Sequence, residues 1–413
     1  MKLKHKKLLL KLIPIAALLA VTGILTLLKK SVAASEFFTR TFSRAYFTVA
    51  GFLTSIFPFS VYEAFMYIAG IVLIILIVRW IILAKRNRKT KALNGVINVV
   101  TAVVCILTMH TFSASLAYNR KPLPVPQYEG ENLGENDLVG ALNFYFDDYN
   151  NIKNQVQRDA EGKVVVPYSG RELAEILAGE YERIGTLDGY LHAFTPKVKS
   201  VGTSIAMSYM NITGVAFTAF GEANINSMTP PLWKIKTAAH ELAHTKGVMR
   251  EADANLLAKY MLLTSENIYL RYSFYTYNLY TLLRAAVTLP QNVLSPYRDA
   301  IKQAEKDRAL EQKFWDDYES IIDKISDFIN DTYLKLSGVK EGVQNYVDLD
   351  KIHFIVLPGG QVKPVVVEYS DVQKLMLEHY LLNKPAGNPS GTGNFQIIKF
   401  PFKFIKLWPI FNK

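Results

Sequence analysis

The residues best suited to chemistry lie in one short stretch, where His240, Glu241 and His244 stand in the order HExxH. Residues four apart on a helix share a face, so His240 and His244 can offer their imidazoles to one metal ion. Glu241 then projects beside that ion without being a ligand. A catalytic zinc site needs three protein ligands and an open fourth position for water, so we expect a third donor from outside this turn.

Two acidic residues downstream compete for the role of third ligand. Gly247 can take a left-handed conformation at no steric cost, which predicts a helix end and a turn that returns Glu251 to the metal. Asp253 is the rival, but it points to nearly the opposite side of the next helix, so only one of the two can face the ion. Asn255, one turn after Glu251, is expected to hydrogen-bond a ligand histidine and fix its tautomer. If Glu251 is the ligand, Asp253 joins Asn255 among the residues around the ligands.

The helix that carries the motif has a readable start. Thr229 is predicted to cap it, and Pro230 and Pro231 follow, where a helix tolerates proline. The plain alternative is a surface helix that holds two histidines by chance. The order of the motif, the helix start and the downstream acid together favour a metal site over that alternative.

The sequence HELAHTKGVMREADAN, residues 240–255, resembles the HExxH-containing superfamily of zinc metallopeptidases, the zincins. Glu251 and the acidic, Ala- and Asn-containing residues after it are similar to the downstream glutamate motif of the glutamate-liganded branch, the gluzincins. The segments FTAFGEANIN, 217–226, and SGVKEGVQNYVDL, 337–349, are similar to a bacterial family of multi-span membrane proteins catalogued as a domain of unknown function. That family brings no established substrate.

The resemblance implies a peptidase of α+β, mostly helical fold, with N-terminal transmembrane helices followed by a zincin-like metallopeptidase ectodomain. One Zn²⁺ per chain is expected on His240, His244 and Glu251, although the order of metal affinities alone does not select zinc among divalent ions. The metal would lower the pKa of a water in the fourth position. Glu241 would take its proton as general base and pass it to the leaving amine.

A substrate-binding strand is expected just before the metal helix. In zincins an edge strand at this place binds extended substrate, and residues 216–226 match it by order. Phe217, Phe220 and Asn224 are the residues of this segment expected to contact the substrate. An ordinary sheet edge without a binding role is an equally simple interpretation of the same segment.

A ladder of tyrosines follows the metal site in the helical stretch 266–287. Tyrosines at these spacings are usually packing residues. One of them could instead hydrogen-bond the oxyanion of a tetrahedral intermediate, and Tyr269 and Tyr272 are the candidates.

The first 117 residues predict a membrane region. Apolar stretches at about residues 8–28, 61–84 and 93–116 are each long enough for a transmembrane helix. The small residues at 31–35 leave cleavage of the first stretch as a lesser alternative. Residues 35–60 are rich in aromatics and include arginines, which favours an amphipathic helix at the membrane interface over a further span.

The charges that flank these stretches predict the orientation in the cell membrane. Lysines at the N-terminus and the basic cluster at 85–91 belong in the cytoplasm by the positive-inside rule, so three spans leave the catalytic domain extracytoplasmic. Residues 118–130 are proline-rich and predict a stiff stalk. Residues 131–393 form the predicted catalytic domain. The tail, 394–413, alternates aromatics with lysines, which fits either an anionic membrane surface or packing along the domain.

Composition and charge exclude several classes of protein. The chain has 413 residues and a net charge of +11, but much of that excess lies beside the apolar stretches, where topology explains it better than nucleic acid does. Its one cysteine, Cys105, permits no intramolecular disulfide. Lys234, Lys236, Lys246 and Arg250 surround the motif, which argues against an intramembrane protease.

The partners expected are therefore a peptide or protein substrate and the lipid bilayer, with no prediction of oligomeric state. A non-catalytic zinc-stabilised receptor or assembly factor is the main alternative. Retention of Glu241, which a structural zinc site does not need, favours the enzyme. Hydrolysis of a non-peptide amide, for example in cell-wall material, is not separated from proteolysis by any feature of the sequence.

Overall fold

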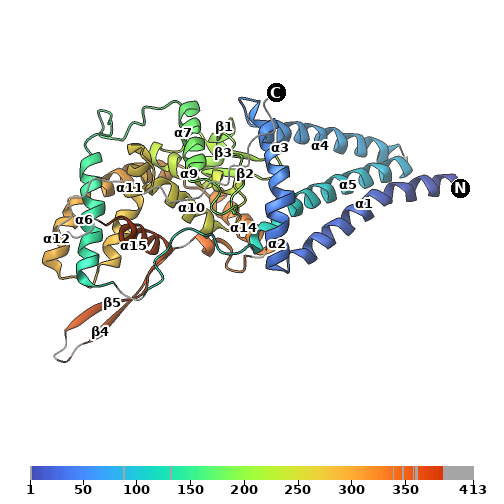
Figure 1. Ribbon diagram of the computed structural model, residues 1–413. Helices are drawn as coiled ribbons and strands as arrows, with labels where there is room; N and C mark the ends of the chain where they lie inside the picture. Colours follow the sequence, from blue (N-terminus) through green and yellow to red (C-terminus); the bar gives the residue numbers. More distant parts are fainter. Residues whose placement is uncertain are drawn as a thin grey trace, which may run out of the picture.

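The computed structural model describes residues 2–86, 89–130, 133–337, 339–346, 348–356, 358 and 361–384. Over these residues the protein is mostly helical, with three long helices on one side of a domain that holds two small sheets (Figure 1). The aromatic and basic tail predicted at 394–413 lies outside the described residues.

Three helices are long and apolar enough to cross a membrane, as the sequence predicts: α1 (Lys2–Leu28), α4 (Val61–Lys85) and α5 (Lys89–Ser113). They extend together from the domain (Figure 1). The hydroxyls of Thr22 on α1 and Thr108 on α5 lie 2.8 Å apart, which links these two helices within an otherwise apolar contact.

A further helical segment lies across the domain-side ends of these three helices, where the sequence predicts an interfacial helix (Figure 1). It consists of α2 (Val32–Phe38), a π-helical turn (Thr39–Ser43) and α3 (Arg44–Ser55). Tyr46 and Thr54 donate hydrogen bonds to the carbonyls of Ala219 and Phe220, so this segment is attached directly to the domain.

The domain also holds the start of α4. The buried carboxylate of Glu222 accepts hydrogen bonds from the backbone N–H groups of Val61 and Tyr62, at 3.1 and 3.0 Å, and pairs with Lys199. An acidic side chain at a helix N-terminus satisfies amides that have no partner within the helix. The membrane-side helices and the domain are therefore joined by buried polar contacts.

The segment predicted to be a stalk packs on the domain instead. Leu123 and Val125 are buried in its hydrophobic core, and the Tyr128 amide donates to the Lys374 carbonyl at 3.0 Å. The apolar residues between the prolines find a surface to cover, so the segment does not stand away from the domain.

The sheet next to the metal helix has three short strands in the order β1-β3-β2. β1 (Lys199–Val201) runs parallel to the central β3 (Glu222–Asn226), and β2 (Gly214–Phe217) runs antiparallel to it on the other side. The helix α8 (Ser204–Tyr209) lies between β1 and β2 in the sequence. β2 is therefore an edge strand.

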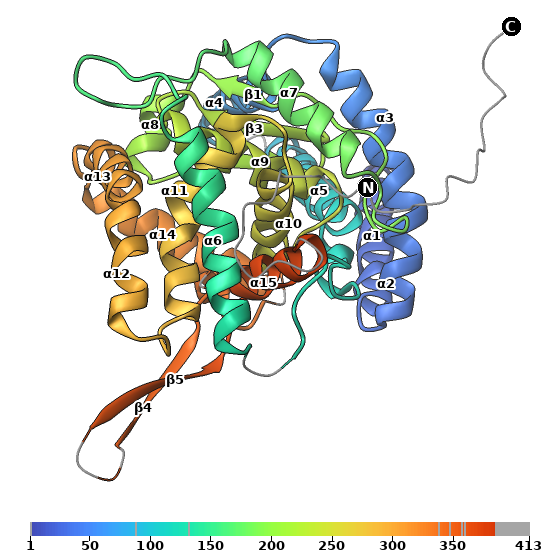
Figure 2. The ribbon, with the colours of Figure 1, turned by 60° about the vertical axis from the view of Figure 1, so that its left-hand side comes forward.

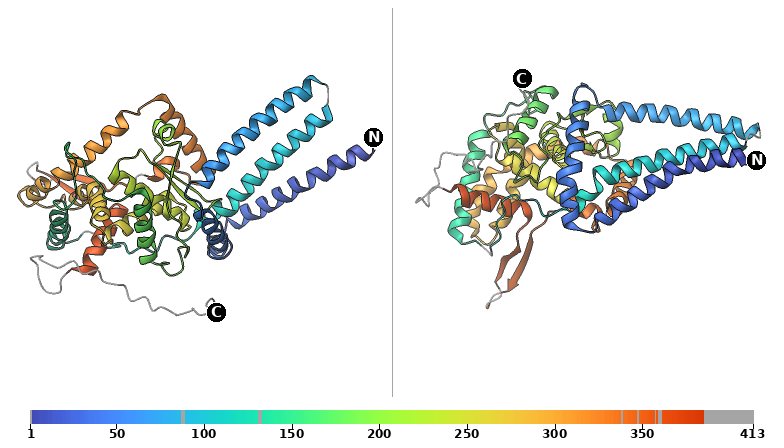
Figure 3. Two further views of the ribbon diagram at one scale, coloured as in Figure 1. Left: turned by 90° about the horizontal axis from the view of Figure 1, so that it is seen from above. Right: turned by 45° about the vertical axis from the view of Figure 1, so that its right-hand side comes forward.

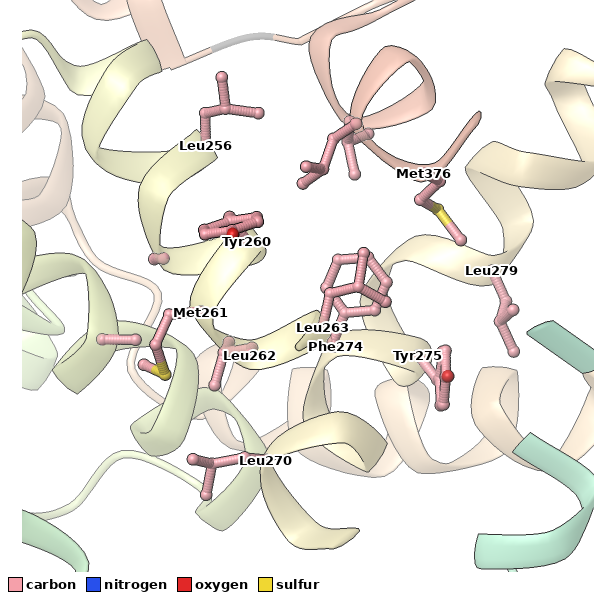
Figure 4. Close-up of a cluster of buried hydrophobic side chains, with 14 of the residues drawn as sticks. Leu256, Tyr260, Met261, Leu262, Leu263, Leu270, Phe274, Tyr275, Leu279 and Met376 are labelled. Carbon is pink, nitrogen blue, oxygen red and sulfur yellow. The ribbon is translucent and has the colours of Figure 1, made fainter. Parts of the chain in front are cut away.

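The core of the domain forms where helices pack around α9 and α11 (Figure 2). Figure 4 shows side chains from α10, α11 and α15 meeting in it, among them Leu263, Phe274 and Met376. A smaller β4–β5 hairpin projects from the domain (Figure 2). The bounds of these and the remaining elements are α6 (Glu135–Ile152), α7 (Gly170–Arg183), α9 (Pro231–Thr245), α10 (Glu251–Leu263), α11 (Ile268–Ala285), α12 (Gln291–Ala300), α13 (Lys302–Asp316), α14 (Ile321–Leu336), β4 (Lys351–Val356), β5 (Val362–Glu368) and α15 (Asp371–Asn383), with short 3₁₀ turns at Ser115–Asn119 and Gly342–Tyr346.

Candidate metal centre

The helix α9 carries the HExxH motif, and its N-terminus is held by a distant acid. The Glu311 carboxylate on α13 accepts hydrogen bonds from the amides of Leu232 and Trp233, at 2.7 and 3.0 Å. The prediction that Thr229 caps this helix is wrong, because Pro230 is the N-cap and the Thr229 hydroxyl is buried without a partner among the described residues. Glu311 complements the positive end of the helix dipole instead.

The C-terminus of α9 ends as predicted, at a glycine that lets the chain turn back. Gly247 has φ +85° and its amide bonds to the His244 carbonyl at 3.0 Å, after which α10 begins at Glu251. A Cβ on Gly247 would lie 2.6 Å from Nε2 of the buried His192. Both the conformation and the close approach therefore require glycine here.

This turn brings three potential ligands together. Nε2 of His240 lies 3.1 Å, and Nε2 of His244 lies 3.4 Å, from the same Glu251 oxygen, and one ligand atom from each residue falls within 4.8 Å of the others. Zinc bonds of about 2.0–2.2 Å place the donors of a tetrahedral site about 3.3–3.6 Å apart. The spacing and the donor types fit a zinc ion. In the described part of the chain this is the one group of His, Cys, Asp and Glu side chains that meets this test.

The rival ligand is turned away from the histidines. Asp253 forms an ion pair with Arg250, whose Nε lies 2.7 Å from its carboxylate. Asn255 is half-buried on α10, and among the described residues its side chain makes no hydrogen bond to either histidine. The His244 ring is oriented by the Val248 carbonyl, 2.8 Å from Nδ1, which leaves Nε2 toward Glu251.

The electrostatics of the cluster favour a bound positive charge. Burial alone would raise the pKa of the Glu251 carboxyl, but the imidazoles of His244 and His240 hold it well below its usual range. Burial opposes charge on His244, and the Glu251 carboxylate outweighs it and raises the pKa of His244 to about 9. The negative charge of a carboxylate that stays ionised beside two imidazoles can be balanced either by a proton on an imidazole or by a metal cation bound to all three groups.

Glu241 lies between this cluster and the edge strand. Its carboxyl is buried, and burial raises its pKa, although it also accepts a backbone hydrogen bond from Ala216 on β2. A Cβ on Gly214 would lie 2.7 Å from Cγ of Glu241, so the strand approaches this closely because residue 214 has no side chain. No motif in the sequence marks Gly214 for this role.

The residues predicted to contact substrate fall in different places. Phe217 ends β2 and stacks on Tyr62 of α4, with ring centroids 3.2 Å apart, while Phe220, in the following turn, lies beside the same ring. Asn224 is on the central strand β3 and is fully buried, so it is not on a free edge. The strand that can offer its edge is β2, at 214–217.

The tyrosines proposed for the oxyanion are engaged elsewhere. The Tyr269 hydroxyl accepts the Gln157 amide, and the Tyr272 hydroxyl donates to Asp307. Burial raises the pKa of Tyr333 on α14, and the negative charge of Glu251 adds to this, so Tyr333 is within electrostatic range of the cluster; its hydroxyl also hydrogen-bonds Tyr118 and Ser337. Its place in an amphipathic helix gave no sequence signal for this role.

A buried arginine ties the metal turn to the membrane side. Arg120, just after α5, donates to the Gly247 carbonyl at 3.1 Å and to the Tyr190 carbonyl at 2.9 Å. The same guanidinium pairs with Glu36 on α2, 2.8 Å away. The turn between the metal helix and Glu251 is thus fixed by residues far away in sequence, which spacing arguments cannot find.

Comparison with known proteins places the chain in a family. The model of the family described as "Protein of unknown function (DUF3810)" matches residues 38–351, which run from the end of α2 to the start of β4. The chain belongs to this family. The DUF3810 match includes α4, α5 and all three residues of the metal cluster, while its description gives no activity. No curated protein and no solved structure matches the chain.

Proposed function

We propose that the protein is a membrane-anchored, zinc-dependent metallopeptidase that hydrolyses peptide bonds on the extracytoplasmic side. One observation carries the proposal: two histidines and Glu251 converge at zinc-ligand spacing, with Glu241 beside them. A structural zinc site needs only its ligands, whereas the buried carboxyl of Glu241 adds a group able to move protons.

His240, His244 and Glu251 would hold the ion, which would supply Lewis acidity toward a carbonyl and toward water. Glu241 takes the proton of the attacking water and delivers it to the leaving amine. Its pKa, raised by burial, is closer to the working pH than that of an exposed glutamate and suits both steps. The Tyr333 hydroxyl is the group we assign to the developing oxyanion, in place of Tyr269 and Tyr272.

The substrate binds in extended form along β2. This strand pairs with β3 on one side only, and Gly214 brings it against Glu241, so a chain added at its free edge runs past the cluster. Backbone hydrogen bonds to an edge strand hold many sequences, which predicts broad rather than single-sequence specificity.

The orientation follows from charge. The lysine-rich N-terminus and the cluster at 85–91 are retained in the cytoplasm, and the three apolar helices then leave the metal centre outside. The site would accordingly act on peptides or proteins of the extracytoplasmic space.

Zinc content of the purified full-length protein tests the proposal. We expect about one zinc per chain in the wild type and a loss to background in Glu251→Ala, because two histidines alone do not complete a zinc site. Asp253→Ala is the matched control, since this acid pairs with Arg250 and should leave the zinc in place. Elemental analysis measures all three.

A peptide library, scanned for cleavage by the zinc-loaded protein, tests the second half of the proposal. Absence of zinc from folded wild type would refute the metal centre. Zinc bound without any cleavage would refute the peptidase and leave a zinc-stabilised receptor or assembly factor.

A further inference from the structure

The helix α14 exposes an apolar face that no described residue covers. Ile321, Phe328 and Leu336 are 76%, 72% and 83% exposed. They recur at helical spacing, so their side chains share one side of the helix. The other exposed apolar members of this face are Ile322, Ile325 and Ile329. A continuous apolar stripe of this kind on a domain surface marks a contact with something apolar.

The two ends of α14 are tied to the domain-side ends of different membrane helices. At its C-terminal end the Lys29 ammonium, just past α1, donates to the Ser337 carbonyl, and the ring of Tyr333 lies 5.6 Å from that of His110 on α5. The helix therefore ends beside the points where α1 and α5 meet the domain.

At its N-terminal end, α14 is linked to the region of α4. The Ser320 hydroxyl donates to the Tyr209 carbonyl at the end of α8, at 3.2 Å. The start of α8 is in turn bound to α4, because Glu63 accepts hydrogen bonds from the amides of Gly202 and Thr203, both at 2.8 Å. Figure 3, in its left panel, shows α14 in orange running across the direction of the three long helices, beside their domain-side ends.

We propose that α14 lies in the bilayer interface, with its apolar face in the acyl region of the leaflet that the domain faces. It would then form a second interfacial helix besides the segment formed by α2 and α3. Interfacial helices bury the apolar face about 5–10 Å into the boundary between headgroups and acyl chains.

The distribution of charge on α14 agrees with this placement. Its acidic and basic residues avoid the exposed apolar side; Asp331, for example, turns to the domain and accepts the Val343 amide at 3.1 Å. The other charged residues of the helix are Asp323, Lys324, Asp327 and Lys335. Both ends of α14 are fixed at the level where the apolar helices meet the domain. An amphipathic helix in this position presents its apolar side to the same lipid as those helices.

Lipid explains the exposed face better than a second copy or a soluble peptide does. The apolar surfaces of α1, α4 and α5 are exposed as well, and they begin where α14 is attached, so a single bilayer covers all of them at once. A soluble partner could cover the apolar face of α14 but not the adjoining apolar surfaces of the three long helices. The placement does not depend on any enzymatic activity.

Site-directed labelling of the full-length protein in phosphatidylcholine–phosphatidylglycerol vesicles tests the placement. In a Cys105→Ala background, a nitroxide is attached after Phe328→Cys, after Ile325→Cys, and after Asp327→Cys as the matched control on the charged side. We expect the first two labels to lose accessibility to a water-soluble nickel chelate and gain accessibility to oxygen, which is concentrated in lipid. The label at the control position should remain accessible to the chelate.

Two results would overturn the proposal. Equal nickel accessibility at all three positions would place the apolar face in water. Protection from both reagents, with spin–spin broadening between labels, would show that a second copy covers the face. Using two apolar positions guards against a single substitution that disturbs the helix, and thermal unfolding of each variant checks the fold separately.

Discussion

Two groups of buried ionisable side chains lie close to α9, and they differ in what satisfies their carboxylates. In the acid–tyrosine network, Asp148 pairs with Arg271 and Tyr275, and Asp307 pairs with Arg158 and Tyr272. Glu311 joins this network through Tyr277 and the amides at the start of α9.

In the candidate metal cluster, Glu251 faces two imidazoles, and it forms no ion pair with an arginine or lysine among the residues that the structure describes. A buried acid that is paired with permanent cations or N–H groups has its charge and hydrogen-bonding capacity satisfied without a ligand. Removing one of these partners lowers the stability of the fold. Where an acid faces imidazoles, the imidazoles can release a proton and bind a metal ion together with the acid. Burial of an acid alone therefore does not identify a reactive site; the kind of partner decides.

The largest effect that separates the two groups should come from Glu241→Gln. We expect cleavage to fall by about 10²–10⁴-fold, because the amide cannot accept the proton of water. Zinc content should stay at the wild-type level, since Glu241 is not a ligand. Steady-state cleavage of a peptide found in the library scan, with parallel elemental analysis, gives both values. Full activity in this variant would remove Glu241 from the mechanism.

Asp307→Asn should have the opposite pattern. It leaves the Arg158 guanidinium without its carboxylate, so we expect a loss of about 3–5 kcal/mol in the free energy of unfolding. Zinc content per folded chain should not change, because no zinc ligand is touched. Chemical denaturation in detergent, followed by tyrosine fluorescence, measures the loss. A variant that is stable but zinc-free would contradict the division between the two groups.

The matched pair Tyr333→Phe and Tyr272→Phe sharpens the comparison at the level of a single hydroxyl. Tyr333→Phe should lower kcat by about 10²-fold, the typical effect of removing one oxyanion donor, with a small change in KM. Tyr272→Phe should leave kcat unchanged and reduce stability only, since its hydroxyl serves Asp307. Equal kcat in both variants would return Tyr333 to a packing role.

The smallest effect expected is a pH dependence of stability at the Glu36–Arg120 pair. Like the acids of the acid–tyrosine network, Glu36 has a permanent cationic partner, but here that partner also contacts the turn at Gly247. Burial opposes ionisation of Glu36, but Arg120 and Arg40 outweigh it and lower its pKa from 4.5 to about 2. A depressed acid pKa stabilises the fold above the unfolded value and loses that contribution as pH falls through the folded value.

The stability difference between wild type and Glu36→Gln should therefore be full above pH 4.5 and shrink toward pH 2. Thermal unfolding of both proteins across this range measures the difference. A gap that stays constant with pH would mean that the carboxylate charge does not contribute.

The sequence by itself determined the local features of this protein. Helical periodicity places His240 and His244 on one face, and the steric freedom of Gly247 ends the helix at φ +85°. The three apolar stretches become long helices because each is long enough to span a bilayer without help from distant residues.

Tertiary structure decided which distant residues meet these local features. Sequence spacing left Glu251 and Asp253 both open, and packing of α10 against α9 turned Glu251 to the histidines, while Asp253 pairs with the neighbouring Arg250. Glu311, 79 residues from the amide it caps, replaced the adjacent Thr229 at the start of the metal helix. Backbone preferences act over a few neighbouring residues, whereas a buried charge takes whichever partner the completed fold places beside it.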